Sequence, residues 1–179
     1  FLVSVASPDS DFNWSEKGIQ GSFRFYNKFV NFMNNIKIGN SSKRLESKLN
    51  KAIKLIGEDV ENFRYNLAVI KLRALLDNFI EEDETGKQDV EKLLLITSIF
   101  MPHICEEIWE RLENKGFIIN AKWPEYDEKK IDKNLEEQEL TINKTLADIN
   151  NILNLIKDEA KNIYLYVLPN ELKVYDQEK

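Results

Sequence analysis

Apolar side chains recur at helical spacing over most of this 179-residue chain, and this pattern constrains the fold more than any other feature. Residues three and four positions apart lie on one face of a helix, so each stripe predicts an amphipathic helix with one buried face. The 6 glycines and 4 prolines are too few for the many tight turns of an all-β fold. We therefore expect an all-α protein, a helical bundle of about five to six helices with a short β-hairpin-like segment at the C-terminus.

The signals that flank the stripes predict where the helices begin and end. Ser15 and Asn66 precede stripes and suit the N-cap position, because their side-chain oxygens accept hydrogen bonds from the first turn. Pro102 lacks a backbone N–H, so we expect a break just before it, and Gly116 should end the helix that follows. The segment 15–37 carries two adjacent stripes, so its helix should be buried over a wide arc at the centre of the bundle. The expected helices are 15–37, 43–62, 66–82, 89–101, 102–116 and 135–157.

The apolar period changes from 3.6 to 2 near residue 161, which indicates a change of domain. Residues 163–168 and 172–175 alternate in the manner of strands, and the Pro-Asn-Glu at 169–171 suits a turn between them. The first residues, in contrast, precede the helical pattern. We therefore expect three parts: 1–13 as the tail of an upstream junction, 14–160 as the helical bundle, and 161–179 as the start of a C-terminal α/β domain.

Groups that would carry catalysis or bind a metal are scarce. The sequence has no glycine-rich phosphate loop, and its one cysteine and one histidine cannot build a zinc site. His103 and Cys105 are two positions apart on a helix and do not face each other, so we expect packing roles for both. We expect no catalytic, cofactor-binding or metal residues, and no membrane span, because the apolar runs are too short. The lone cysteine favours a reducing, cytoplasmic location.

The distribution of charge leaves nucleic-acid binding open. The net charge of −6 argues against it, since phosphates are bound by Lys and Arg. A local excess of cations nevertheless begins at residue 37 and is opposed only by Glu46, so an acidic molecule can still present one basic edge. Such an edge is more often merely solvated, and a tryptophan before proline more often packs over a helix seam than stacks on a base. The candidate RNA-binding residues are Lys37, Lys43, Arg44, Lys48, Lys51, Lys54 and Trp123.

Four segments, in their order and spacing, resemble the helical tRNA-binding bundle of class I aminoacyl-tRNA synthetases. Residues 7–25, SPDSDFNWSEKGIQGSFRF, look like the junction after the catalytic domain in archaeal and eukaryotic leucyl-tRNA synthetases. Residues 63–68, FRYNLA, are similar to the family's step between bundle helices, with Leu67 in place of the usual threonine. Residues 102–109, PHICEEIW, resemble a signature that the leucyl, valyl and isoleucyl enzymes share, and the Trp-Pro at 123–124 matches the family's pair after the bundle.

This resemblance implies a function as well as a fold. It implies an anticodon-binding-type bundle that positions tRNA(Leu), within a leucine–tRNA ligase whose ATP and magnesium site lies upstream of this chain. The implied partners are tRNA(Leu) and the rest of the synthetase chain. Two alternatives stay open at this point: the equivalent domain of an isoleucyl- or valyl-tRNA synthetase, and a protein–protein scaffold bundle that binds no RNA.

Overall fold

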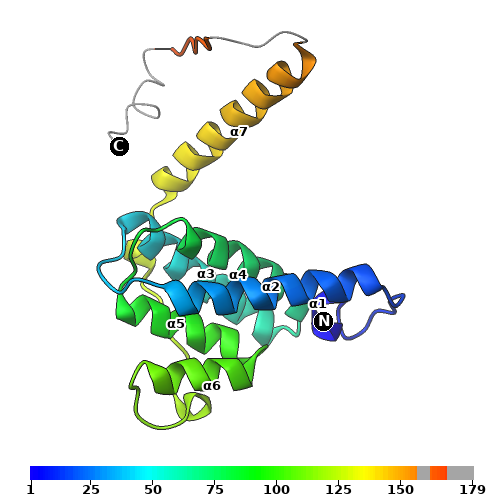
Figure 1. Cartoon of the computed structure of the whole chain (residues 1–179), viewed down its shortest axis with the longest axis vertical. Coiled ribbons are helices and arrows are strands. Elements are labelled where there is room, and N and C mark those ends of the chain that lie inside the picture. The colour runs from blue at the N-terminus through cyan, green and yellow to red at the C-terminus, as the bar shows by residue number, and fades with distance from the viewer. Residues whose placement is uncertain (157–161, 169–179) are drawn as a thin grey trace. The chain divides into compact units, whose positions relative to one another are not determined.

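The computed structural model describes residues 1–156 and 162–168, which form two compact units, Phe1–Ile131 and Asp132–Lys179 (Figure 1). Each unit is described by itself, and the domain boundaries expected above stay a prediction. The first unit contains α1 (Leu2–Val5), α2 (Glu16–Asn35), α3 (Lys43–Glu61), α4 (Tyr65–Ile80), α5 (Lys87–Ser98) and α6 (Pro102–Arg111), followed by the 3₁₀ turns η1 (Ile118–Asn120) and η2 (Glu128–Lys130). The second contains α7 (Lys133–Leu155). The all-α prediction is confirmed for the described residues, with the short α1 as an unexpected addition.

Serine caps begin two of the long helices. The Ser15 hydroxyl accepts a hydrogen bond from the Gly18 N–H at 3.4 Å, as expected, so α2 begins at Glu16. The Ser42 hydroxyl accepts one from the Leu45 N–H at 3.0 Å, and α3 begins at the next residue. These bonds satisfy amides that have no partner inside the helix, which fixes the starting points of both helices.

The turn between α3 and α4 corrects the expected cap at Asn66. Phe63 takes a left-handed conformation with φ of 58°, and the Arg64 N–H donates to the Asp59 carbonyl at 2.8 Å. This is a Schellman arrangement, which ends a helix sharply and leaves the chain ready to begin another. Consequently α4 begins at Tyr65, with Arg64 at the cap position, and the Asn66 side chain lies inside the first turn.

Pro102 separates α5 from α6 as predicted. It occupies the first position of α6, where its missing N–H costs nothing. The expected end at Gly116 is wrong, because α6 already ends at Arg111 and Glu113 takes the left-handed conformation with φ of 61°. The Asn114 N–H donates to the Trp109 carbonyl at 3.3 Å, so a second Schellman arrangement stops the helix before the glycine is reached.

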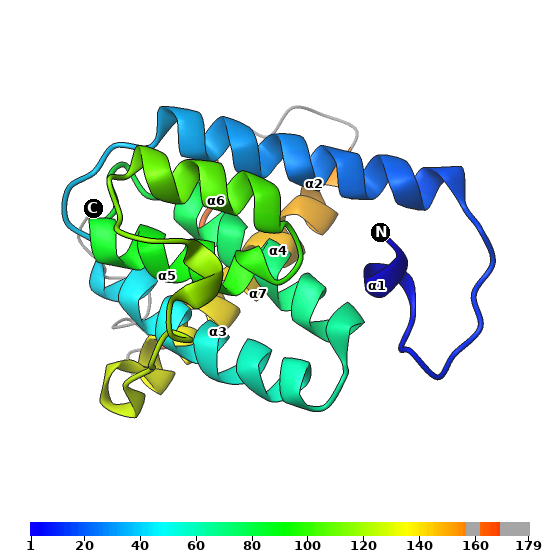
Figure 2. The same cartoon turned by 90° about the horizontal axis from the view of Figure 1, so that it is seen from below.

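The core of the first unit lies where α3, α4 and α5 meet, with α2 and α6 packed against them. Its fully buried members include Phe29 of α2, Leu49 of α3 and Phe79 of α4. Figure 2 shows that the N-terminal half of α2 extends past α5 and α6, toward α1. The expectation of burial over a wide arc therefore fails for this half: Phe29 and Met33 are buried, whereas Ile19 and Phe23 are exposed.

The second unit does not contain the expected β-hairpin in its described residues. Residues 162–168 form no strand, and the Tyr166 side chain is 93% exposed. The rest of the expected hairpin, residues 169–175, lies outside the described residues. Among the described helices, none is long and apolar enough to cross a membrane.

Candidate nucleic-acid interface

The candidate cations lie on α3 or shortly before it, but their surroundings differ. Lys37 follows α2, Lys43 is the first residue of α3, and both side chains are exposed. Within the described ranges, neither lysine makes a side-chain hydrogen bond or ion pair. An anion could therefore bind either ammonium group without displacing an existing side-chain partner.

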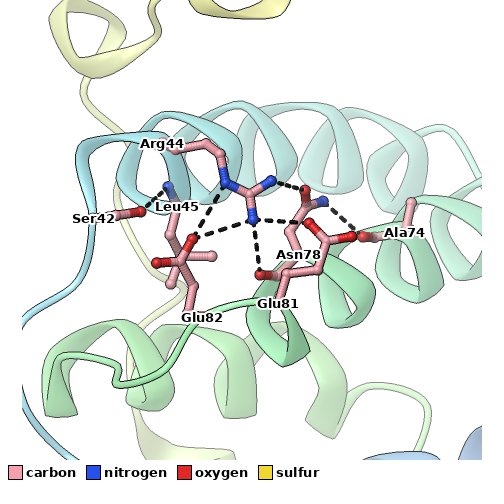
Figure 3. Close-up of polar contacts among 7 residues, drawn as sticks. All are labelled: Ser42, Arg44, Leu45, Ala74, Asn78, Glu81 and Glu82. Carbon is pink, nitrogen blue, oxygen red and sulfur yellow. Dashed lines mark hydrogen bonds and ion pairs between the residues drawn. The ribbon is translucent and has the colours of Figure 1, made fainter. Parts of the chain in front are cut away.

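Arg44 is held by carboxylates at the end of α4 (Figure 3). Its Nη2 atom lies 2.9 Å from the Glu81 carboxylate and 3.2 Å from that of Glu82, while Nη1 donates to the Asn78 side chain at 3.3 Å. The Glu82 side chain is only 12% exposed, so at least one of these pairs is shielded from water. The planar guanidinium thus joins α3 to α4, and a phosphate would have to displace two acids to reach it.

Lys54 is also engaged, about three turns farther along the same helix. Its ammonium contacts the Glu128 carboxylate of η2 and lies 5.7 Å from the centroid of the Tyr126 ring. The hydrogen bond from Lys54 to Glu128 and the charge of that carboxylate raise the pKa of Lys54. Lys130 of η2 pairs with Glu46 of α3 at 2.5 Å, so the contact between the two elements carries two compensated ion pairs.

Lys48 and Lys51 are partly buried, and neither is without an interaction. The structure therefore divides the candidate cations by availability. Lys37 and Lys43 are exposed and make no side-chain hydrogen bond or ion pair within the described residues. Arg44 and Lys54 are neutralised by neighbouring acids. Lys48 and Lys51 are intermediate in their exposure to an incoming anion. The assignment of these residues to RNA binding stays a prediction.

Trp123 lies against α3 and is 40% exposed. Its indole Nε1 lies 3.4 Å from the position that a Cβ on Gly57 would occupy, so the absence of a side chain at Gly57 lets the ring approach the helix closely. One part of the ring therefore packs over a helix, as the sequence analysis expects of a tryptophan that precedes proline. A base could stack only on the part of the Trp123 ring that remains exposed.

Sequence reasoning missed a groove between α2 and the loop from α4 to α5. It has a volume of about 630 Å³, and α2 lines it with Asn27, Asn31 and Asn35, one per turn. Arg24, Lys28 and Lys37 add positive charge, and residues 82–84 supply three carboxylates on the other side. The spacing of four between asparagines was the available signal. The charges of this groove therefore balance, and among its cations only Lys37 belongs to the candidate RNA-binding residues.

His103 and Cys105 separate as their spacing predicted. Cys105 is fully buried, and burial raises the pKa of its thiol to about 12. It is therefore a small core side chain rather than a nucleophile. The expectation of a packing role is wrong for His103, which lies exposed on the first turn of α6, since that turn faces outward at this position.

The helical fold agrees with the comparisons with known proteins. The family model described as the anticodon-binding domain of tRNA ligase matches residues 42–165. The chain belongs to this family of tRNA-ligase domains. The match includes α3 with its cations, the α5–α6 pair and the tryptophan at 123.

The curated relatives of the chain are leucine–tRNA ligases. That of Rickettsia bellii (strain RML369-C) is 31% identical over 175 residues, covering 91% of this chain and 21% of its own length. That of Orientia tsutsugamushi (strain Boryong) is 34% identical over 151 residues, covering 79% of this chain and 18% of its own length. The chain thus spans about a fifth of the length of these relatives.

A solved structure shares the fold. It is the AgnB2 LeuRS of Agrobacterium radiobacter K84 in a ternary complex with tRNA and LeuAMS, with a TM-score of 0.56 and 21% identity, covering 73% of this chain and 20% of that one. Together these matches correct the expected archaeal and eukaryotic type, since the relatives named are bacterial.

Proposed function

We propose that this chain is the tRNA-binding bundle of a leucine–tRNA ligase and that it positions tRNA(Leu) for leucylation elsewhere in the synthetase. The observation that supports this most is the family match over residues 42–165, combined with relatives that are leucine–tRNA ligases. Those relatives weaken the isoleucyl and valyl alternative. The proposed role places the chain in the cytoplasm, where tRNA is used.

Leucylation itself would take place outside these 179 residues. Gly18 and Gly21 are the closest pair of glycines, and both lie inside α2, where their amides face along the helix rather than into a phosphate-binding loop. The residues that the structure describes therefore do not fit ATP and its magnesium. In this proposal, ATP and magnesium bind another part of the synthetase, and the bundle contributes tRNA binding alone.

Charge governs the proposed mode of binding, with backbone phosphates as the targets. Lys37 and Lys43 are the leading contacts, because a phosphate reaches them without displacing an acid. Arg44 and Lys54 serve mainly the structure of the bundle, because each is already paired. Lys48 and Lys51 are secondary candidates. The availability of each cation, rather than the net charge of −6, then decides where RNA binds.

A matched pair of double variants tests this mode. Each phosphate contact adds about 0.9 to the slope of log affinity against log salt, which corresponds to about eightfold in affinity at 0.1 M salt. Lys37→Ala with Lys43→Ala should therefore weaken tRNA(Leu) binding by up to about sixtyfold and lower the slope by about 1.8. Lys54→Ala with Lys130→Ala removes the same charge from lysines that are already paired, and should weaken binding only a few fold. Filter binding at salt concentrations from about 50 to about 300 mM, over which added salt screens the charges increasingly, measures the affinity of both double variants.

Three results would contradict parts of the proposal. Equal losses for the two double variants would show that overall charge, not contact, governs binding. Equal retention of tRNA(Leu) and tRNA(Ile) would remove the preference for leucine tRNA. Negligible retention of either RNA at low salt would favour the scaffold alternative, for which the acidic composition is the main support.

A further inference from the structure

The loop between α2 and α3 carries one leading cation, precedes the other, and is bound to the loop between α4 and α5. Lys37 stands near its beginning, and Lys43 follows its end as the first residue of α3. The Thr85 N–H donates to the Lys37 carbonyl at 2.9 Å, and the Gly39 N–H donates to the Thr85 carbonyl at 3.0 Å, which makes a short parallel bridge. Thr85 is buried, so the backbone of Lys37 is held at a fixed point of the bundle.

Glu84 holds the next part of the same loop. Its carboxylate accepts a hydrogen bond from the Asn40 N–H at 3.0 Å, and it lies so close to Gly39 that a Cβ at that position would collide with it. The Gly86 N–H in turn donates to the Ser41 hydroxyl at 2.9 Å. Three consecutive residues of the first loop therefore each contact the second loop.

The same acidic segment also holds the chain just after Lys43. Arg44 is joined to Glu81 and Glu82 (Figure 3), so contacts from the end of α4 and the loop after it lie on both sides of Lys43 in the sequence. By charge alone these carboxylates oppose phosphate binding, but by their contacts they fix the backbone that carries both lysines. The two effects have opposite signs. Glu84 separates them best, because its carboxylate bonds the loop backbone rather than a candidate cation.

We propose that Glu84 is a positioning residue for tRNA, which holds the loop so that Lys37 and Lys43 meet backbone phosphates in one fixed arrangement. A loop that is already ordered loses less conformational entropy when RNA binds, and this raises the affinity without any contact between Glu84 and the RNA. The role rests on the proposed function, because Glu84 acts through the two lysines that bind tRNA there. An acidic side chain thus promotes the binding of a polyanion.

Four variants separate the position of the loop from its charge. Glu84→Ala should weaken tRNA(Leu) binding about fivefold, the scale expected when one flexible segment must become ordered on binding. Asp83→Ala removes the same charge from the adjacent residue, which makes no side-chain hydrogen bond or ion pair among the described residues, and should leave binding unchanged or tighten it. Glu84→Gln keeps an acceptor for the Asn40 N–H and should retain at least the wild-type affinity. Gly39→Ala changes no charge but displaces the Glu84 carboxylate, and should weaken binding about as much as Glu84→Ala. Filter binding at about 100 mM salt measures all four.

A double-mutant cycle identifies the groups through which Glu84 acts. In the variant with Lys37→Ala and Lys43→Ala, the further change Glu84→Ala should cause no additional loss of affinity, because the lysines that it positions are gone. An additional loss of about fivefold in that background would overturn the positioning role, and so would unchanged or tighter binding when Glu84→Ala is made alone. Either result would leave the proposed function standing. Negligible tRNA binding by the wild-type chain would instead contradict the proposed function, and the positioning role with it.

Discussion

Asp59 is the charged side chain whose replacement should affect the bundle most. Its carboxylate is 5% exposed at the end of α3, and it accepts a hydrogen bond from Arg64 Nε at 2.9 Å and another from the Lys71 ammonium. The Asp59 carbonyl also accepts from the Arg64 N–H in the turn between α3 and α4. One residue therefore fastens the end of one helix, the turn and the first part of the next helix.

The cost of Asp59→Ala follows from these contacts. A hydrogen bond to a charged group contributes about 1.5–3 kcal/mol. The side chains of Arg64 and Lys71 are 44% and 31% exposed, so water replaces part of what they lose and the lower end of the range applies. Removal of the carboxylate also relieves the cost of burying it. We therefore expect a loss of about 2–3 kcal/mol in the free energy of unfolding.

Urea unfolding followed by circular dichroism measures this loss, and Asp77→Ala is the matched control. Asp77 pairs with Lys28 at 2.5 Å, but the two side chains are 55% and 48% exposed, so its replacement should cost less than about 1 kcal/mol. If the two variants lose the same stability to within about 0.5 kcal/mol, burial does not set the strength of these pairs and the reasoning is refuted.

Further measurements test other parts of the structure. Burial alone would raise the pKa of Asp59, but hydrogen bonds from Lys71 and Arg64 outweigh it and lower the pKa below its ordinary value of 3.8. The stability from Asp59 is therefore present above pH 3.8 and lost as pH falls through the lowered value, and acid titrations of the wild type and Asp59→Ala should converge there. The Cys105 thiol, with its pKa raised to about 12, should resist iodoacetamide at about pH 8 until urea unfolds the chain, as followed by mass spectrometry. Glu113→Gly should raise stability by about 1 kcal/mol because it relieves the left-handed φ, whereas Glu110→Gly inside α6 should lower it by a similar amount in the same urea assay.

Local signals predicted the helices because each signal acts within one turn. Ser15 and Pro102 did what their chemistry requires, since a hydroxyl cap and a missing N–H depend only on neighbouring residues. The helix ends were harder to predict. Phe63 and Glu113 take left-handed conformations that the sequence alone assigns to glycine or asparagine, and packing of the adjoining helices holds them there. Residue propensity predicted Gly116 as the left-handed residue that ends the helix, whereas in the structure Glu113, three residues earlier, takes this conformation.

The apolar stripes of α2 predicted burial along the whole helix, but the structure buries only its C-terminal half. The spacing correctly indicated an apolar face, but spacing alone cannot state which part of that face another element covers. Phe29 and Met33 find partners within the bundle, while Ile19 and Phe23 do not. The pattern therefore predicts which face of α2 is apolar, whereas the structure decides how much of that face is covered.

The candidate cations show why charge counted along a sequence misleads about a surface. Along the chain, only Glu46 opposes the lysines and arginine between residues 37 and 54. In the fold, Glu81 and Glu82 arrive from 37 and 38 positions away to engage Arg44, and Glu128 from 74 positions away to engage Lys54. The acidic run after α4, which looks like a solvated loop in sequence, is therefore partly a set of counterions for α3. Because such pairing leaves cations available only at particular places, an acidic chain can bind RNA by position while part of its positive charge stabilises its own fold.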